Sequence, residues 1–212
     1  NQIKIIRGAG VDLSKYSYKE ENNDKIKVSM ACRLLKDKGV FEYVEAAKIF
    51  SQRVHGTRKQ KLPNVEFELY GDIDADNPAS LTIEDVEKIK KESFVNVYGF
   101  SSDIAKVFSD SNIVVLPSYR EGLPKVLIEA AACGRAVVTT DVPGCRDAIE
   151  PNITGLLCKV KDSQSLAEQI EKLIIDKELR ISMGKEGRKL AQKEFDIKQI
   201  VQKHFEIYEG KL

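Results

Sequence analysis

The sequence predicts an α/β protein with a Rossmann-like parallel sheet that helices cover on both faces. Short apolar segments alternate along the chain with longer amphipathic ones, which is the order of βαβ units. The apolar segments are rich in Val, Ile and Leu with little polar alternation, as expected for parallel strands buried on both faces. Hydrophobic residues make up 42% and charged residues 32% of the 212 residues, which is ordinary for a globular domain.

Each expected strand is a short run of mainly apolar residues, and each expected helix has a longer mixed pattern. The expected strands are 26–31, 65–71, 95–100, 113–117, 136–140 and 155–160. The expected helices are 39–54, 82–92, 103–110, 124–133, 163–176, 178–194 and 197–209. Thr82 and Asp85 form a capping box at the start of the second helix. Residues 13–25 are polar and are predicted to form a mobile loop.

Composition argues against several classes of protein. The net charge of +1 gives no case for nucleic-acid binding. No apolar run approaches the roughly 20 residues that span a bilayer. His55 and His204 are isolated in the sequence, which is typical of surface or packing residues, and no acid/base pair of the hydrolase type is recognised.

The cysteines point to a reduced, cytoplasmic protein without a metal site. None of them forms a CxxC pair, the spacing that would favour metal binding. A few scattered free thiols are typical of a reducing compartment. The cysteines are Cys32, Cys133, Cys145 and Cys158.

The segment EGLPKVLIE carries the clearest chemical signal. Glu121 and Glu129 lie on either side of a loop-to-helix junction, and Pro124 fits the first turn of the helix because it lacks an N–H. A helix N-terminus presents free N–H groups and a partial positive charge to an anion. Two carboxylates beside an anion site predict a ligand with phosphate in the middle and hydroxyl-rich groups at either end, such as a nucleotide sugar.

Other candidate residues follow neighbouring strands. Open parallel sheets bind ligands beyond the carboxyl ends of their strands. Arg33 and Lys38 follow the first strand, and Phe100 and Ser101 follow the third. The two cations suit a diphosphate; from the residues alone, a solvated basic turn remains open. Lys36 matches an ordinary loop residue.

Glu129 is flanked by apolar residues, so the helix is predicted to be buried almost all round. A buried carboxylate is unfavourable unless it is hydrogen-bonded, and a ribose diol supplies two donors. A plain surface position for Glu129 is the alternative.

Residues 110–144, DSNIVVLPSYREGLPKVLIEAAACGRAVVTTDVPG, closely resemble the core of the family 4 (group 1) glycosyltransferases, which are retaining enzymes of the two-domain GT-B fold. The family's two glutamates separated by seven residues are matched by Glu121 and Glu129. The resemblance implies the C-terminal half of a GT-B fold: an interdomain linker at 1–12, a donor domain at 13–196, and a helix at 197–212 that packs on an absent N-terminal domain. A dinucleotide glycine loop is the rival interpretation of 8–12, but its third glycine is missing.

The resemblance also implies roles for single residues. Arg33 and Lys38 bind the diphosphate, Glu129 holds the ribose hydroxyls, and Glu121 is the catalytic-site carboxylate beside the donor sugar, without acting as a nucleophile. The N–H groups of Leu123, Lys125 and Val126 serve the diphosphate. Phe100 and Gly122 complete the expected substrate-binding set. No metal or other cofactor is implied, because the cations and the helix N-terminus neutralise the leaving group.

The expected function is therefore donor binding in an enzyme that moves a sugar from a nucleotide sugar, expected to be a UDP-sugar, to a lipid-linked or saccharide acceptor. The segments 74–80 and 101–104 resemble the branch that builds capsule, O-antigen or exopolysaccharide. The fragment alone is expected to transfer no sugar and to expose Ile200, Val201, Phe205 and Tyr208. The full-length enzyme is expected in the cytoplasm, in peripheral contact with the inner face of the membrane. A non-catalytic nucleotide-binding module and a GT-B epimerase remain alternatives.

Overall fold

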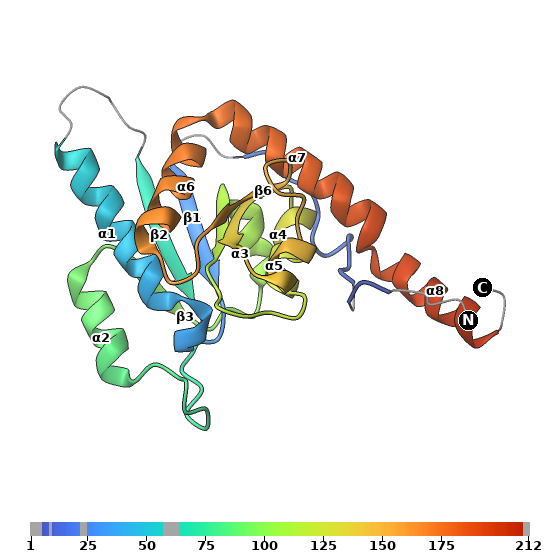
Figure 1. The fold of residues 1–212 in the computed structure, drawn as a ribbon, viewed down its shortest axis with the longest axis horizontal. Helices are drawn as coiled ribbons and strands as arrows, with labels where there is room; N and C mark the ends of the chain where they lie inside the picture. Colours follow the sequence, from blue (N-terminus) through green and yellow to red (C-terminus); the bar gives the residue numbers. More distant parts are fainter. Residues whose placement is uncertain (1–5, 9, 22–24, 57–63, 210–212) are drawn as a thin grey trace.

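The computed structural model describes residues 6–8, 10–21, 25–56 and 64–209. Figure 1 shows one sheet between helices, with the last helix extending away from the body of the domain. The strands are β1 (Ile26–Ala31), β2 (Val65–Tyr70), β3 (Asn96–Gly99), β4 (Ile113–Leu116), β5 (Ala136–Thr140) and β6 (Gly155–Cys158). The helices are η1 (Lys36–Lys38), α1 (Val40–Gly56), α2 (Ile83–Glu92), α3 (Ile104–Asp110), α4 (Lys125–Ala132), α5 (Pro143–Asp147), α6 (Ser163–Ile175), α7 (Lys177–Glu194) and α8 (Ile197–Tyr208).

The sheet has the order β3-β2-β1-β4-β5-β6, and every neighbouring pair is parallel. The chain builds outward from β1 in one direction and then from β4 in the other, so the strand order reverses between β1 and β4. This is the topological switch point of a doubly wound sheet, where ligands bind beyond the carboxyl ends of the strands. The predicted fold class is confirmed.

Both faces of the sheet are buried, as the apolar strands predicted. Within β4, Ile113 and Val115 belong to the core on one face, and Val114 and Leu116 belong to the core on the other. Successive side chains of a strand point to opposite faces, so a strand buried on both sides must be apolar throughout. Helices α1 and α6 pack together over the first face, while α3 and α4 cover the second.

Three details differ from the sequence prediction. Pro124 is the N-cap of α4, with ψ at 113°, and the helix begins at Lys125 rather than in a turn containing the proline. The short helices η1 and α5 were not predicted, because each is too short to show a hydrophobic period. The proline that opens α5 was the available signal, since proline favours the first helical turn.

Residues 13–21 are held in place, so the prediction of a mobile loop is wrong there. Nη1 of Arg188 donates to the backbone oxygen of Tyr16 at 2.8 Å, and Nε of Arg180 donates to Oε2 of Glu21 at 3.0 Å. Arg135 donates to the backbone oxygen of Lys19 in the same segment. Buried guanidinium groups require such acceptors. The polar sequence reflected pairing with distant arginines, and residues 22–24 lie outside the described ones.

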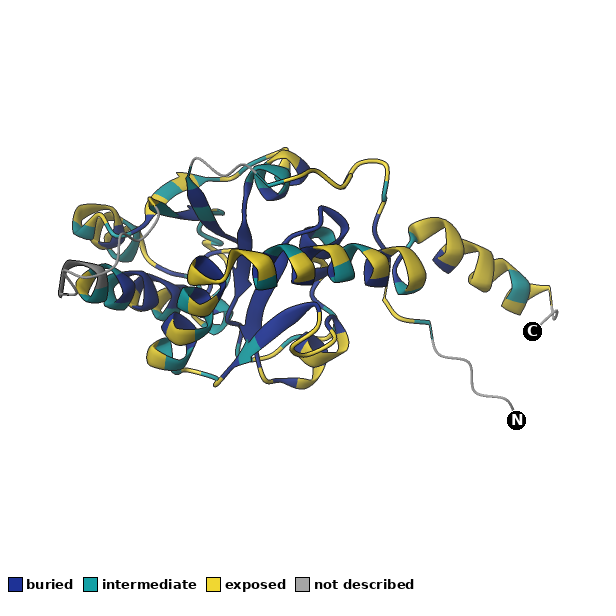
Figure 2. Ribbon diagram, turned by 90° about the horizontal axis from the view of Figure 1, so that it is seen from above, coloured by how far each residue is buried: buried dark blue, intermediate teal, exposed yellow. Residues whose placement is uncertain are grey.

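The two ends of the domain meet at a hydrogen-bonded bridge. The N–H of Val11 donates to the oxygen of Phe195 at 2.7 Å, and the N–H of Ile197 donates to the oxygen of Val11 at 3.1 Å. Beyond this point α8 extends outward with most of its surface exposed (Figure 2). Ile200 is buried at 3% exposure, contrary to the prediction. The apolar side chains of α8 that do stand exposed are Ile197, Val201, Phe205, Ile207 and Tyr208.

Candidate functional site

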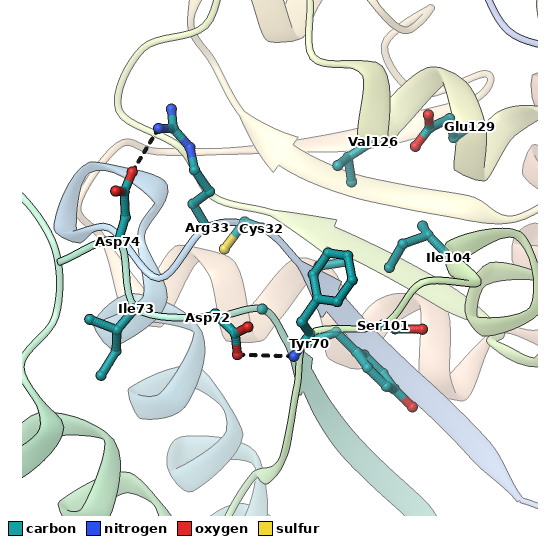
Figure 3. Close-up of a pocket in the computed structure, with 13 residues that line it drawn as sticks. Cys32, Arg33, Tyr70, Asp72, Ile73, Asp74, Ser101, Ile104, Val126 and Glu129 are labelled. Carbon is teal, nitrogen blue, oxygen red and sulfur yellow. Dashed lines mark hydrogen bonds and ion pairs between the residues drawn. The ribbon is translucent and has the colours of Figure 1, made fainter. Parts of the chain in front are cut away.

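A cavity of about 490 Å³ lies beyond the carboxyl ends of β1, β2 and β3. Five candidate residues from the sequence contribute to its wall: Arg33, Phe100, Ser101, Val126 and Glu129. They come from separate parts of the chain, and the parallel topology brings them together (Figure 3). Asp72 and Asp74, from the loop that follows β2, also line the cavity.

Helix α4 supplies the wall that carries Val126 and Glu129. These residues are three apart, so they share one face of the helix, and both line the cavity. Leu127 and Ile128 are buried in the domain. Glu129 itself is half-buried, so the expectation of a fully buried carboxylate is wrong. Its position at a cavity wall leaves the carboxylate accessible to a ligand.

Tyr16 lies next to Glu129 and was missed by the sequence analysis. Burial raises the pKa of the Tyr16 phenol, and the neighbouring Glu129 carboxylate raises this pKa further. The hydroxyl therefore stays protonated at neutral pH and presents a donor to the carboxylate. No local motif announced this contact, because Tyr16 belongs to the segment that was predicted to be mobile.

Lys38 and Glu121 form an ion pair beside the cavity. The Lys38 Nζ lies 2.6 Å from the Glu121 Oε1, and the two side chains are 21% and 13% exposed. Gly39 explains the approach of their loops. It has φ at 76°, and a Cβ on it would lie 2.3 Å from the oxygen of Pro117, so only glycine lets the loop after β1 close onto the loop after β4.

Arg33 is turned toward a carboxylate as well. Its Nη1 lies 2.9 Å from the Oδ2 of Asp74, and Figure 3 shows Val126 and Glu129 on the other side of the cavity. The neighbouring Asp72 accepts a hydrogen bond from the N–H of Phe100 at 3.1 Å. This bond fixes the start of the loop that follows β3, and the Phe100 ring remains 73% exposed at the rim.

The remaining predicted residues form the loop and first turn before the cavity wall. Gly122 and Lys125 are exposed, and neither belongs to the residues that line the cavity. Leu123 is half-buried and packs close to Gly8. Helix α5 supports this loop from behind, because a Cβ on Gly144 would lie 2.2 Å from the oxygens of both Glu121 and Gly122.

The cavity offers no reactive thiol. Burial raises the pKa of Cys32, which lines the wall, to about 12, so this group stays neutral at physiological pH. Among the residues that the structure describes, no cluster of three or more His, Cys, Asp or Glu side chains is placed to hold a metal ion. Within the same ranges, no helix has the length and apolar character needed to cross a membrane.

Comparison with known proteins agrees with this geometry. The sequence profile described as "Glycosyl transferases group 1" matches residues 15–190. The chain is 32% identical over 222 residues to an N,N'-diacetylbacillosaminyl-diphospho-undecaprenol alpha-1,3-N-acetylgalactosaminyltransferase of Campylobacter jejuni, covering 99% of this chain and 54% of the relative. It is 31% identical to the capsular polysaccharide biosynthesis glycosyltransferase CapM of Staphylococcus aureus, covering 82% of this chain and 43% of the relative.

Among solved structures, the Anabaena HepE protein in complex with UDP superposes with a TM-score of 0.77 at 22% identity, over 95% of this chain and 56% of that one. This likeness shows the fold, and the chain spans about half the length of these relatives. The six-stranded parallel sheet matches the glycosyltransferase structures, and the profile match extends over most of the sequence. The chain belongs to the group 1 glycosyltransferases.

Proposed function

We propose that this chain is the donor-binding half of a retaining glycosyltransferase that moves a sugar from a UDP-linked donor to a lipid-linked or saccharide acceptor in surface polysaccharide biosynthesis. The names of the relatives support the class of reaction: one acts on a diphospho-undecaprenol-linked sugar and another belongs to capsule biosynthesis. The HepE structures with UDP and with UDP-glucose support the donor.

The cavity receives the nucleoside half of the donor. The charged side chains in its wall are one cation, Arg33, and three carboxylates, Asp72, Asp74 and Glu129. Such a wall disfavours the phosphates and suits a neutral group that is rich in hydroxyls. Glu129 accepts hydrogen bonds from the ribose diol.

The diphosphate lies at the rim of the cavity, where the cations and the start of α4 come together. Arg33 and Lys38 neutralise its charge, and the N–H groups of Leu123, Lys125 and Val126 donate to its oxygens. Pro124 between them has no N–H to donate. These groups supply the electrostatic stabilisation of the leaving diphosphate, so we propose a reaction without a metal or other cofactor.

Glu121 holds hydroxyls of the donor sugar, next to the loop of Gly122. The anomeric C–O bond to the diphosphate breaks through an oxocarbenium-like state, and the bond electrons remain on the departing diphosphate. Lys38 Nζ lies 2.6 Å from Glu121 Oε1. In the proposed complex Lys38 turns to the leaving diphosphate and Glu121 to the sugar, so the breaking bond lies between these two side chains.

We propose the domain plan of the family for this chain: a linker through residue 12, a donor domain from 13 to 196, and a terminal helix from 197 that packs on the other half of the enzyme. The exposed apolar face of α8 supports this plan, because such faces are usually covered by a partner. The bridge between Val11 and Asp196 then marks the point where both connections leave the domain. The whole enzyme acts in the cytoplasm, at the inner face of the membrane.

The observation that carries the proposal is the convergence of Glu129, Arg33 and the Lys38–Glu121 pair on the switch point of the sheet. Two measurements test it. Calorimetry with the chain should detect UDP binding, and fusion to an upstream half from a relative should give sugar transfer from a UDP-sugar. UDP binding without transfer by any fusion would favour the non-catalytic module instead. Absence of UDP binding would overturn the proposal.

A further inference from the structure

Arg33 and Asp74 lie on two loops that backbone hydrogen bonds join into one unit. The loops follow β1 and β2. The joining bonds are Leu34 N to Asp72 O at 3.0 Å, Lys36 N to Ala79 O at 2.8 Å and Leu81 N to Leu34 O at 2.8 Å. The ion pair between Nη1 of Arg33 and Oδ2 of Asp74, at 2.9 Å, therefore connects two positions whose backbones are fixed relative to each other.

The backbone of Asp74 is fixed by two hydrogen bonds. The N–H of Asp74 donates to the Oγ of Ser80 at 3.0 Å, and the backbone oxygen of Asp74 accepts from the N–H of Asn77 at 2.9 Å. The side chain is only 29% exposed, whereas that of Arg33 is 64% exposed. The arginine side chain is the longer and more exposed partner, and the aspartate is the shorter and less exposed one on a hydrogen-bonded backbone.

The other carboxylates of the cavity wall have different partners. Asp72 accepts from the N–H of Phe100, and Glu129 lies on α4, across the cavity from Arg33 (Figure 3). Asp74 is thus the carboxylate of this wall that pairs with Arg33. A diphosphate that binds Arg33 must break the ion pair between Arg33 and Asp74. The bound diphosphate then lies near the Asp74 carboxylate, which has lost its counter-ion.

We propose that Asp74 is an internal competitor of the donor diphosphate for Arg33 and that it limits how tightly the site holds a nucleoside diphosphate. This inference rests on the proposed function. Two consequences follow from the charges alone. Removing the negative charge strengthens UDP binding, and the gain depends on the phosphates of the ligand. Weaker holding of the nucleoside diphosphate also favours its release after transfer, a step that limits many enzymes.

The test is Asp74→Asn in the 212-residue chain. Asparagine keeps the size and a neutral acceptor for Arg33 but removes the charge. Asp76→Asn is the matched control, because Asp76 is an exposed residue of the same loop and the substitution changes the net charge equally. Dissociation constants of UDP and of uridine are measured by calorimetry for the three proteins, at low and high salt.

Asp74→Asn should bind UDP about two- to five-fold more tightly than wild type, the size of a partly exposed ion pair. Its affinity for uridine and the UDP affinity of Asp76→Asn should match wild type, and the gain should shrink at high salt. Equal or weaker UDP binding by Asp74→Asn, with wild type binding UDP normally, would overturn this inference and leave the proposed function intact. If wild type binds neither ligand, both fail.

Discussion

Lys38 and Glu121 are joined by a 2.6 Å ion pair across the switch point of the sheet. Lys38 belongs to η1, after β1, and Glu121 to the loop after β4, and the sheet order places these two strands side by side. The pair holds a cation and a carboxylate side by side at the site. A diphosphate and its sugar would replace this internal contact by one contact each.

Lys38→Ala should weaken UDP binding by about ten-fold or more, because a hydrogen bond to a charged group contributes roughly 1.5–3 kcal/mol. Uridine affinity should not change, since the loss concerns the phosphates. The measurement is calorimetric titration with both ligands. Lys36→Ala is the matched control: Lys36 lies in the same short helix and is exposed, and its removal should leave both affinities at the wild-type value. A comparable loss of UDP affinity in Lys36→Ala would indicate that Lys38 acts through the general positive charge of this loop and not through a direct contact with the phosphates.

Glu121→Gln should affect binding of the donor sugar without weakening binding of the nucleotide. The substitution frees Lys38 from its counter-ion, so UDP should bind at least as tightly as to wild type. Any additional affinity that wild type shows for UDP-glucose over UDP should disappear, and transfer by an active full-length fusion should fall by about 10²-fold or more, as when one oriented polar group is removed from an active site. A variant that loses UDP affinity but retains transfer would contradict this assignment of Glu121.

The meeting of Lys38 and Glu121 was predictable from topology, because both follow strands that adjoin in a doubly wound sheet. The partners of these residues were less predictable. Asp74 holds Arg33 through a loop whose shape depends on backbone bonds between distant segments, and no local pattern encodes such bonds. Tyr16 reaches Glu129 because a segment of polar composition is fixed by arginines more than a hundred residues away.

The elements themselves were predicted well where their pattern was long enough. All six strands are present, with ends shifted by no more than two residues. The exact start of α4 was missed, since Pro124 is compatible with both the N-cap and the first turn. Its extended ψ of 113° puts Pro124 outside the helix.

Glu129→Gln should weaken UDP binding because the variant loses the charge that accepts hydrogen bonds from the ribose diol. The expected loss is about ten-fold, corresponding to one charge-assisted hydrogen bond. For 2′-deoxy-UDP, the difference between wild type and variant should be smaller, because that ligand keeps only one of the two donors. Titration of both proteins with both ligands forms a complete cycle. An equal loss for the two ligands would assign Glu129 a structural role.

Gly39→Ala should destabilise the domain and pull the site apart. The positive φ of 76° strains alanine by roughly 1–3 kcal/mol, and its Cβ would meet the Pro117 oxygen at 2.3 Å, so the loops after β1 and β4 must separate. Thermal unfolding should show a lower Tm. The folded molecules should also bind UDP more weakly than wild type, because Lys38 is adjacent to Gly39. Gly122→Ala is the stability control. A Cβ at Gly122 meets nothing within 4 Å, so the free energy of unfolding of this variant should stay within about 0.5 kcal/mol of the wild-type value. Equal stability of the two variants would show that the contact between Gly39 and Pro117 does not hold the loops together.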